Sequence, residues 1–391
     1  MSFDSSPFLP YGRQDITDAD IAAVLDVLRS PFLTQGPAIP AFEQAMATKV
    51  NALFGVAVNS ATSALHIACL SLGLARGDRL WTSPITFVAS ANCGRYCGAT
   101  VDFVDIDPAT GLMSVAALEN KLVQAERDGT LPKVVVPVHL AGSSCNMEAI
   151  GSLAERYDFV VLEDASHAIG GCFGGEPVGN CNYSAITVFS FHPVKIITTG
   201  EGGMATTNDP LLAQRMVELR SHGITKDEAR FERSAPGPWS YEQQRLGFNY
   251  RMTDLQAALG LSQLQRLDNI VSERNRQFLR YQELLADLPA QLLEIPEDVF
   301  SSVHLAVVRL QQATAEQHRR VFEALRTAGI GVQLHYTPVH LQPYYRRLGF
   351  REGDFPEAEA YGNNAISLPL FPGLHEYEQA RVVELLSISL S

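Results

Sequence analysis

Short apolar runs alternate with helical patterns over the first half of the chain. Runs rich in Val, Ile and Phe occur between residues 52 and 207, and segments with apolar residues at helical spacing separate them. Such runs are typical of strands in a mostly parallel sheet, because helices cover both faces of that sheet. The pattern predicts an α/β fold in this half, with strands at residues 55–58, 102–104, 134–136, 160–162 and 186–189.

The second half begins with a polar stretch between Thr225 and Arg245 that follows neither periodicity. This stretch indicates a surface insertion that can line an active site. Thr253 is a candidate N-cap for a long helix, because apolar residues recur at helical spacing from Leu255 to Ile270. Such a helix would link two lobes.

Beyond this helix the pattern mixes both kinds of element. Residues 303–308 are strand-like and residues 316–328 are helical, which predicts a smaller α+β domain at the C-terminal end. A chain of 391 residues also exceeds what one hydrophobic core usually supports. We therefore expect a large domain over residues 1–255, including an N-terminal arm, and a small domain over residues 256–391.

Composition and charge narrow the functional classes. The chain has 46% hydrophobic and 19% charged residues, as a globular protein does, and its apolar runs are too short to span a membrane. Residues 1–6 have neither the basic start nor the apolar core of a secretory signal, so we expect a cytoplasmic location. The formal net charge of −13 and the absence of a basic block argue against nucleic-acid binding, although a nucleotide-bearing small substrate needs only a few local donors.

The six cysteines are scattered and form no CxxC pair. A zinc site or a disulfide framework has little support, and we expect no bound metal. Free thiols in a reducing compartment are the expected state of these side chains.

Lys195 is the first candidate for chemistry. It stands between a strand-like segment and an Ile-Ile-Thr-Thr run, where partial loss of hydration disfavours the ammonium form. A neutral amine can attack an aldehyde. The alternative is a lysine whose stem packs while its ammonium reaches water. Two neighbours favour a ligand site: Ser190 offers a hydroxyl to a phosphate, and the Gly-rich residues 200–203 allow backbone to pass close to a ligand.

Two further motifs supply an anion site and an acid. Residues 56–66 run from a strand through small hydroxylated residues into a helix, whose first N–H groups and dipole favour phosphate, although simple helix capping is the alternative. Asp164 follows a buried strand at the sheet edge where ligands collect, and a carboxylate there can keep a pyridine nitrogen protonated. A helix cap or an exposed acidic loop is the alternative for Asp164, and a structural role is the alternative for His167, which can otherwise bond a phenolic oxygen.

In chain order, the sequence has a turn that can bind phosphate at residues 56–66, an aromatic ring at Phe87 and an acid at Asp164. A serine that can bind phosphate, Ser190, and a lysine, Lys195, follow. Pyridoxal phosphate needs an anion cradle, a stacking face, a pyridinium partner and an amine. Phe87 can equally be a core residue. No strand is followed by a GxGxxG turn, which argues against a nicotinamide enzyme.

The sequence resembles the DegT/DnrJ/EryC1/StrS family of sugar aminotransferases over nearly its whole length. The resemblance implies an aspartate-aminotransferase-like fold, the type I fold of pyridoxal-phosphate enzymes. His167 stands where many members carry Gln, a change that keeps a hydrogen-bond donor. The motifs that carry the resemblance are residues 33–37 (LTQGP), 59–65 (NSATSAL), 163–168 (EDASHA), 190–192 (SFH) with Lys195, 200–203 (GEGG) and 247–252 (GFNYRM).

The resemblance also implies roles for individual residues. Lys195 would be the Schiff-base lysine, Asp164 would pair with the pyridine nitrogen, and Phe87 would cover the ring. Phosphate contacts would come from Ala61, Thr62 and Ser190, and from Asn249 of the partner subunit, which implies a homodimer with shared sites. The residues expected to face the sugar nucleotide are Tyr11, Pro31, Phe32, Leu33, Thr34, His335, Tyr336, Thr337 and Pro338.

Within the family, the chain is most similar to enzymes that move an amino group from L-glutamate to C4 of a UDP-linked 2-acetamido-2,6-dideoxy-4-keto-hexose in pseudaminic acid biosynthesis. The sequence motifs shared with them include residues 87–92 (FVASAN), 220–223 (RSHG) and 258–264 (ALGLSQL). Amination of another nucleotide-linked keto sugar, with dTDP or GDP, is one alternative. A non-catalytic ligand-binding member of the fold is another. A sugar dehydratase of the same fold would carry His at the Schiff-base position, so Lys195 counts against it.

Overall fold

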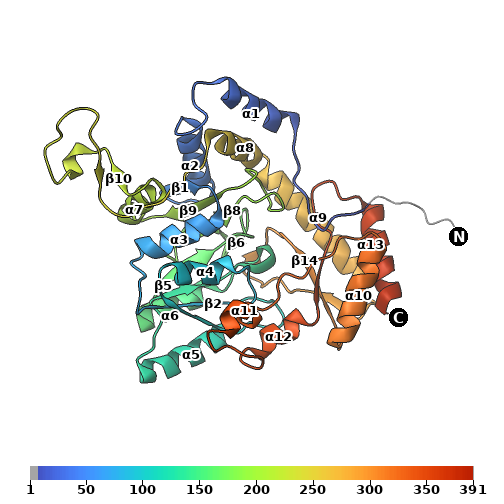
Figure 1. Ribbon diagram of the computed structural model, residues 1–391. Coiled ribbons are helices and arrows are strands. Elements are labelled where there is room, and N and C mark those ends of the chain that lie inside the picture. Colours follow the sequence, from blue (N-terminus) through green and yellow to red (C-terminus); the bar gives the residue numbers. More distant parts are fainter. Residues whose placement is uncertain (1–7, 391) are drawn as a thin grey trace.

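The computed structural model describes residues 8–390 and has two lobes, which Figure 1 shows. Residues 1–6, from which we expect no export signal, lie outside the described residues. Within residues 8–390, no helix has the length and apolar character needed to cross a membrane.

The large lobe is built on a seven-stranded sheet. β9 (Gly203–Thr207) runs antiparallel to both of its neighbours, and the other neighbouring strands are parallel, so the expected mostly parallel sheet is confirmed. Four of the five runs predicted from the apolar pattern lie within strands of this sheet, and the run 102–104 extends one residue beyond its strand. In spatial order its strands are β1 (Phe54–Val58), β9 (Gly203–Thr207), β8 (Ile186–Ser190), β5 (Val160–Asp164), β4 (Val134–Val136), β2 (Arg79–Thr82) and β3 (Thr100–Phe103).

Helices cover both faces of this sheet, and strand alternation decides which core each side chain joins. The helices of this lobe are α1 (Asp18–Arg29), α2 (Ala38–Lys49), α3 (Ala61–Ser71), α4 (Ala89–Tyr96), α5 (Val115–Asp128), α6 (Met147–Tyr157), α7 (Pro210–Arg220), α8 (Asp254–Leu264) and the start of α9 (Leu267–Leu285). On β1, Val56 and Val58 join a cluster with α3 to α7, whereas Ala57 joins a cluster with α2, α8 and α9.

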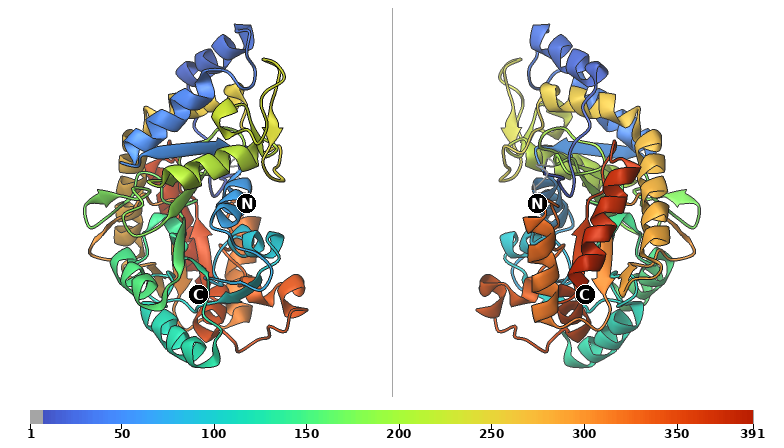
Figure 2. Two further views of the ribbon diagram at one scale, coloured as in Figure 1. Left: turned by 90° about the vertical axis from the view of Figure 1, so that its left-hand side faces the viewer. Right: turned by 90° about the vertical axis from the view of Figure 1, so that its right-hand side faces the viewer.

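The smaller lobe is α+β, as expected. Its antiparallel sheet has the order β12 (Ala290–Leu292), β14 (Ala306–Leu310) and β15 (Ala365–Leu368). α10 (Ala315–Thr327) packs beside α13 (Glu376–Leu390), and the two lie side by side in Figure 2. Its core also takes in Leu9 from the N-terminal arm, so the two ends of the chain meet in this lobe.

The shorter elements complete the chain. They are η1 (Leu140–Gly142), β6 (Cys172–Phe173), β7 (Glu176–Pro177), β10 (Ile224–Thr225), η2 (Glu228–Arg230), β11 (Glu242–Gln243), β13 (Val299–Phe300), η3 (Val339–Leu341), α11 (Pro343–Arg346) and α12 (Pro356–Gly362). β10 and β11 pair, and the polar insertion that they bracket projects from the large lobe in Figure 1. The insertion does not line the cavity described below.

The helix predicted across residues 255–270 is two helices, α8 and α9, separated by Gln265 and Arg266. Thr253 caps α8 as predicted, in a capping box with Gln256. α8 packs against α1 and α2, as Figures 1 and 2 show, so it lies with the large lobe. The division of the chain at residue 255 stays a prediction.

Asp254 joins α8 to the start of α2. Its two carboxylate oxygens accept hydrogen bonds from the backbone N–H groups of Gly36 (2.8 Å) and Ala38 (2.9 Å), and the residue is buried. We expect Asp254→Ala to lower the free energy of unfolding by about 2 kcal/mol, because it leaves buried donors without acceptors. Urea unfolding measures the change. Asp287→Ala removes an exposed carboxylate and should cost less than about 0.5 kcal/mol. Equal losses in the two variants would contradict this role of Asp254.

Candidate active site

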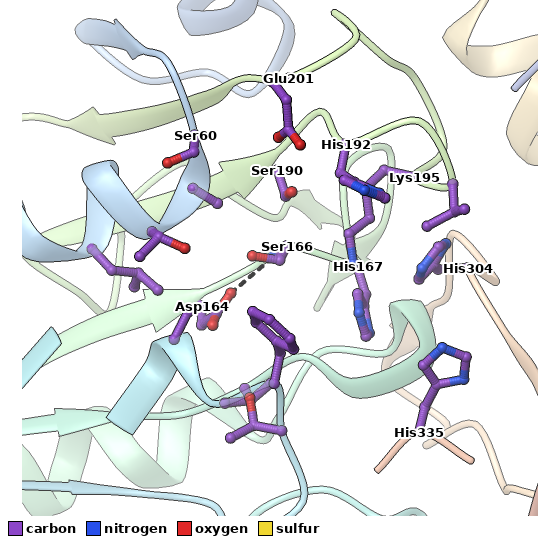
Figure 3. Close-up of a pocket in the computed structure, with 18 of the residues that line it drawn as sticks. Ser60, Asp164, Ser166, His167, Ser190, His192, Lys195, Glu201, His304 and His335 are labelled. Carbon is purple, nitrogen blue, oxygen red and sulfur yellow. Dashed lines mark hydrogen bonds between the residues drawn. The ribbon is translucent and has the colours of Figure 1, made fainter. Parts of the chain in front are cut away.

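A cavity of about 850 Å³ lies at the carboxyl ends of β5 and β8, against the first turn of α3. Ligands of open α/β sheets bind at this edge. Figure 3 shows that Asp164, Ser190 and Lys195 converge on the cavity from different segments. Of the residues expected to bind cofactor or substrate, those that line the cavity are Tyr11, Ala61, Thr62, Phe87, Asp164, His167, Ser190, Lys195, His335 and Tyr336.

Asp164 is the last residue of β5, and only 4% of its surface is exposed. One carboxylate oxygen accepts a hydrogen bond from the Ser90 hydroxyl (2.6 Å), and the other accepts one from the Ser166 backbone N–H (3.1 Å; Figure 3). The Thr86 hydroxyl lies 2.6 Å from that of Ser90, whose own proton is committed to Asp164. Among the described residues, Asp164 has no ion-pair partner within 4 Å. The protein therefore orients this carboxylate without neutralising it.

Lys195 follows β8 in a turn closed by a hydrogen bond from its own N–H to the His192 carbonyl. Its side chain lines the cavity and makes no hydrogen bond to the described residues. Loss of hydration lowers the pKa of Lys195 to about 8, although the negative charge of Asp164 acts in the opposite direction. A substantial share of the amine is therefore neutral near pH 7 to 8, and a neutral amine is a nucleophile.

The first turn of α3 forms an anion cradle beside Ser190. Ser60 caps the helix by accepting from the Ser63 N–H, which leaves the N–H groups of Ala61 and Thr62 without acceptors among the described residues. The Ser190 hydroxyl lines the same cavity. β9 runs so close to this turn that a Cβ at Gly203 would meet the Ala61 nitrogen at 2.5 Å. The turn therefore offers free donors at a helix N-terminus, where phosphate binds well.

The wall on the small-lobe side carries aromatic and imidazole rings. His167 Nδ1 accepts the Ala141 backbone N–H (3.3 Å), so its proton is on Nε2, which lies 3.1 Å from the Tyr336 hydroxyl. The rings of His167 and His304 are 4.4 Å apart, and His335 Nδ1 lies 2.8 Å from the Ser367 hydroxyl.

These imidazoles are uncharged at neutral pH. Burial, with smaller contributions from neighbouring positive charges, lowers the pKa values of His167 and His304 well below the ordinary range. The same effects lower the pKa of His335 to about 3. Phe87 is 59% exposed in front of this wall, so one face of its ring is open to a ligand.

Several residues expected at the site lie outside this cavity. Pro31, Phe32, Leu33 and Thr34 form an exposed segment between α1 and α2. Asn249 is exposed and pairs with Ser221. The other two, Thr337 and Pro338, follow the cavity-lining Tyr336 without lining the cavity themselves. One chain alone therefore does not bring these residues to the site.

The structure adds residues that sequence reasoning missed. Ser90 is 74 residues from Asp164 in the chain, and its motif gave no sign of that hydrogen bond. His304 lies in a segment that the sequence predicts as a strand, and its buried Nδ1 atom has no hydrogen-bond partner in the described part of the chain. Ser166, His192 and Glu201 also line the cavity and stand within the motifs already singled out.

Behind Asp164, on the opposite face of β5, Glu163 is held by a buried network. His139 Nδ1 accepts the Cys145 backbone N–H, so Nε2 donates to Glu163 over 2.7 Å. Burial alone would raise the pKa of Glu163, but the hydrogen bonds from His139 and from the Ser184 and Thr187 hydroxyls lower it. This network fixes the end of the strand that presents Asp164.

Comparison with known proteins agrees with this geometry. The model of the DegT/DnrJ/EryC1/StrS aminotransferase family matches residues 14–387. The chain is 38% identical over 382 residues to the spore coat polysaccharide biosynthesis protein SpsC of Bacillus subtilis, with 96% of each chain covered. A solved structure of the putative sugar aminotransferase Spr1654 of Streptococcus pneumoniae, in its PMP form, superposes with a TM-score of 0.90 at 31% identity, covering 98% of this chain and 99% of that one. PseC of Helicobacter pylori, an aminotransferase involved in the biosynthesis of pseudoaminic acid, gives 0.89 at 30% identity with the same coverage.

The chain therefore belongs to the DegT/DnrJ/EryC1/StrS aminotransferase family. It is a pyridoxal-phosphate-dependent sugar aminotransferase with the type I fold, and both the cofactor and the fold class expected from the sequence are confirmed. These similarities exclude the alternative from the sequence analysis, a non-catalytic ligand-binding protein of the same fold.

The hydrogen bond from Ser90 to Asp164 gives the first test of the site. Ser90→Ala removes the donor of a buried charge-assisted bond, which should weaken cofactor binding by about tenfold. Dialysis followed by spectrophotometric titration with pyridoxal phosphate measures the dissociation constant. Ser152→Ala, which removes an exposed hydroxyl on α6, is the matched control and should bind the cofactor as the parent does. An unchanged dissociation constant in Ser90→Ala would refute the positioning role.

The pKa of Lys195 gives the second test. Only the neutral amine attacks an aldehyde, so the rate at which apoenzyme captures pyridoxal phosphate should rise about tenfold per pH unit below pH 8 and level off above it. Stopped-flow absorbance from pH 6 to pH 10.5 follows the reaction. Nα-acetyl-lysine, measured in parallel, corrects for titration of the cofactor and should show no plateau in this range. A protein rate that still climbs at pH 10 would show that the amine is not desolvated.

Proposed function

We propose that this enzyme moves an amino group from L-glutamate to C4 of a UDP-linked 2-acetamido-2,6-dideoxy-4-keto-hexose, in pseudaminic acid biosynthesis. The observation that carries the proposal is a cavity in which the readily neutralised amine of Lys195 faces the buried carboxylate of Asp164. The imidazoles in the wall on the small-lobe side are uncharged. The similarity to PseC supports the pathway.

The residues present fit pyridoxal phosphate. Its phosphate would be held by the N–H groups of Ala61 and Thr62 and by the Ser190 hydroxyl, and Asp164 would pair with its ring nitrogen. Phe87 would cover the ring. The cofactor, when bound, supplies an aldehyde and a ring that withdraws electrons from the reacting carbon.

Lys195 then has two successive tasks. Its amine would hold the cofactor, and it would be free while the amino donor is bound. The free amine then takes the proton from Cα of L-glutamate and later returns a proton to C4 of the sugar. A pKa of about 8 suits both directions, because near neutral pH the amine both accepts and releases protons readily.

The neutral wall suits a sugar ring. Tyr11, His335 and Tyr336 present hydroxyl and imidazole groups that can bond sugar hydroxyls and carbonyls without adding charge. Lys195 is the only Lys or Arg among the described residues that line the cavity, so the charged diphosphate of the substrate must lie nearer its mouth. There Thr337 and Pro338 would contact it together with residues of a second subunit.

A homodimer with shared sites is part of the proposal. Ile21, Leu25 and Leu28 form an exposed apolar stripe on α1, and Phe32 and Leu33 extend it. Asn249 and the segment from Pro31 to Thr34 lie outside their own cavity, as residues that serve the partner's site would. A cytoplasmic location stays a prediction from the sequence.

Supplying a panel of UDP-, GDP- and dTDP-linked 4-keto sugars with L-glutamate tests the substrate. We expect 2-oxoglutarate to form at least about tenfold faster with the UDP-linked 2-acetamido-2,6-dideoxy sugar than with the others, because a site built for particular polar groups rejects analogues that leave those groups unpaired. A coupled assay for 2-oxoglutarate measures turnover, and Lys195→Ala is the inactive control.

The outcomes of this experiment separate the proposed UDP-sugar specificity from the aminotransferase activity itself. Turnover of only GDP- or dTDP-linked sugars would overturn the UDP assignment and leave the aminotransferase intact. Loss of a sugar hydroxyl as water, with no nitrogen left on the sugar, would instead favour a dehydratase, which the presence of Lys195 argues against.

A further inference from the structure

His304 is a buried histidine of the cavity wall whose side chain makes no hydrogen bond within the protein. Its imidazole lines the cavity, and only 3% of the residue's surface is exposed. Among the described residues, Nδ1 has no hydrogen-bond partner and Nε2 makes no hydrogen bond either. Buried polar side chains normally have a partner, so this ring brings unused hydrogen-bonding capacity to the cavity (Figure 3).

The other buried imidazoles of this wall are already engaged. His167 uses both of its ring nitrogens, and its Nε2 lies 3.1 Å from the Tyr336 hydroxyl. The Nδ1 atom of His335 lies 2.8 Å from the Ser367 hydroxyl. Of the buried histidines that line the cavity in the described chain, His304 is therefore the one whose two nitrogens are both left for a ligand.

The segment that carries His304 is packed tightly against the large lobe. The His304 N–H donates to the Ala141 carbonyl (2.7 Å), and the Ser302 N–H donates to the Gly142 carbonyl (3.1 Å). Gly142 has a φ of +104°, and a Cβ there would meet the Val303 nitrogen at 2.7 Å. Only glycine allows the two backbones to approach so closely. The place of the imidazole is therefore fixed from the large lobe.

The backbone of this segment is strained, and a buried arginine holds it. Val303 has a φ of +47°, in the left-handed region that β-branched residues avoid. The guanidinium of Arg274, which is 1% exposed, donates to the carbonyls of Val303 (3.4 Å) and His304 (3.2 Å). Such strain persists only where the surroundings enforce it, and it is frequent at ligand sites. The fold thus enforces the position of a ring that has no partner of its own.

His304 also lies toward the reacting end of the cavity. Its ring centroid is 4.4 Å from that of His167. Burial lowers the pKa of both rings, and the positive charge of Lys195 contributes, so the amine is near them. The Lys195 amine must reach the carbon that receives nitrogen, which in the proposed function is C4 of the sugar. A ring beside this amine is placed to contact substituents on the two carbons next to C4.

These substituents are the hydroxyl group at C3 and the methyl group at C5. An imidazole can hydrogen-bond a hydroxyl, whereas a methyl group offers it neither a donor nor an acceptor. The neutral ring has one N–H and one lone pair, and a hydroxyl group can pair with either. The chemistry of the unpartnered ring therefore selects the C3 hydroxyl.

We propose that His304 binds the C3 hydroxyl of the keto sugar, next to the carbon that is aminated, and so selects acceptors that carry this hydroxyl. The proposal rests on the proposed function, because it takes C4 of a 4-keto sugar as the acceptor carbon. A sugar without the hydroxyl would leave the buried imidazole unpaired, and such a loss slows the reaction of the analogue.

A matched pair of sugars tests the contact. The substrates are the nucleotide-linked 4-keto sugar that the parent uses best and its 3-deoxy counterpart, supplied to holoenzyme loaded with pyridoxamine phosphate. We expect kcat/KM of the parent to be about tenfold lower for the 3-deoxy sugar. His304→Leu should lose about tenfold on the complete sugar and no more on the 3-deoxy sugar, because both changes remove one contact. His304→Gln keeps a donor and an acceptor and should regain part of the loss.

The amino-donor half-reaction separates this contact from a structural role. Formation of 2-oxoglutarate from L-glutamate, by holoenzyme loaded with pyridoxal phosphate, takes place without the sugar. Its single-turnover rate should be unchanged in His304→Leu. His375→Ala removes an exposed imidazole of the small lobe and should behave as the parent in both half-reactions. Thermal denaturation of each holoenzyme checks that the variants fold.

Three results would overturn the proposal. A parent enzyme that uses the 3-deoxy sugar as efficiently as the complete sugar is the first, and it requires no variant to fold. The second is an additive loss, in which His304→Leu and the missing hydroxyl each lower kcat/KM independently. The third is an equal fall in both half-reactions of His304→Leu. A parent that aminates none of the UDP-, GDP- and dTDP-linked sugars would instead remove the proposed function, and this proposal with it.

Discussion

Asp164 carries a negative charge at the end of β5, where 4% of its surface reaches solvent and no cation of the described chain lies within ion-pair distance. A buried carboxylate is costly unless it is hydrogen-bonded and paired. Ser90 and Ser166 provide the hydrogen bonds but not the opposite charge. The site therefore favours a ligand with a protonated ring nitrogen, and that demand explains why the surrounding groups are arranged as they are.

The alternation of side chains along β5 places the carboxylates of Glu163 and Asp164 on opposite faces of the sheet. Glu163 points away from the cavity into the network with His139, while Asp164 points into it. The neighbouring parallel strand β8 ends at Ser190, and the turn after it returns Lys195 toward the same edge. Two adjacent strands thus place an acid, a phosphate donor and an amine around one cavity, and helix α3 supplies the remaining anion donors.

Sequence reasoning could find the parts of the site that lie within single segments. Asp164 after an apolar run and Lys195 before a Gly-rich stretch carry local signals, and the strand pattern sets the class of fold. Ser90 and His304 carry no such signal, because their importance depends on contacts across 74 and more residues that exist only in the folded chain. The break between α8 and α9 was missed for a related reason: both helices keep apolar residues at helical spacing, and only packing shows where one ends.

The neutrality of the histidine wall follows from the same constraint as the buried acid. Lys195 and the cofactor site already concentrate charge in a cavity with little water, so a protonated His335 or His304 would add unfavourable repulsion and lose hydration. Neutral imidazoles keep one donor and one acceptor each, which suits hydroxyl and carbonyl groups better than carboxylates. An amino-acid donor brings carboxylates that this wall does not neutralise. The cations that hold them must therefore come from outside the wall, near the mouth, where one chain alone leaves the site open.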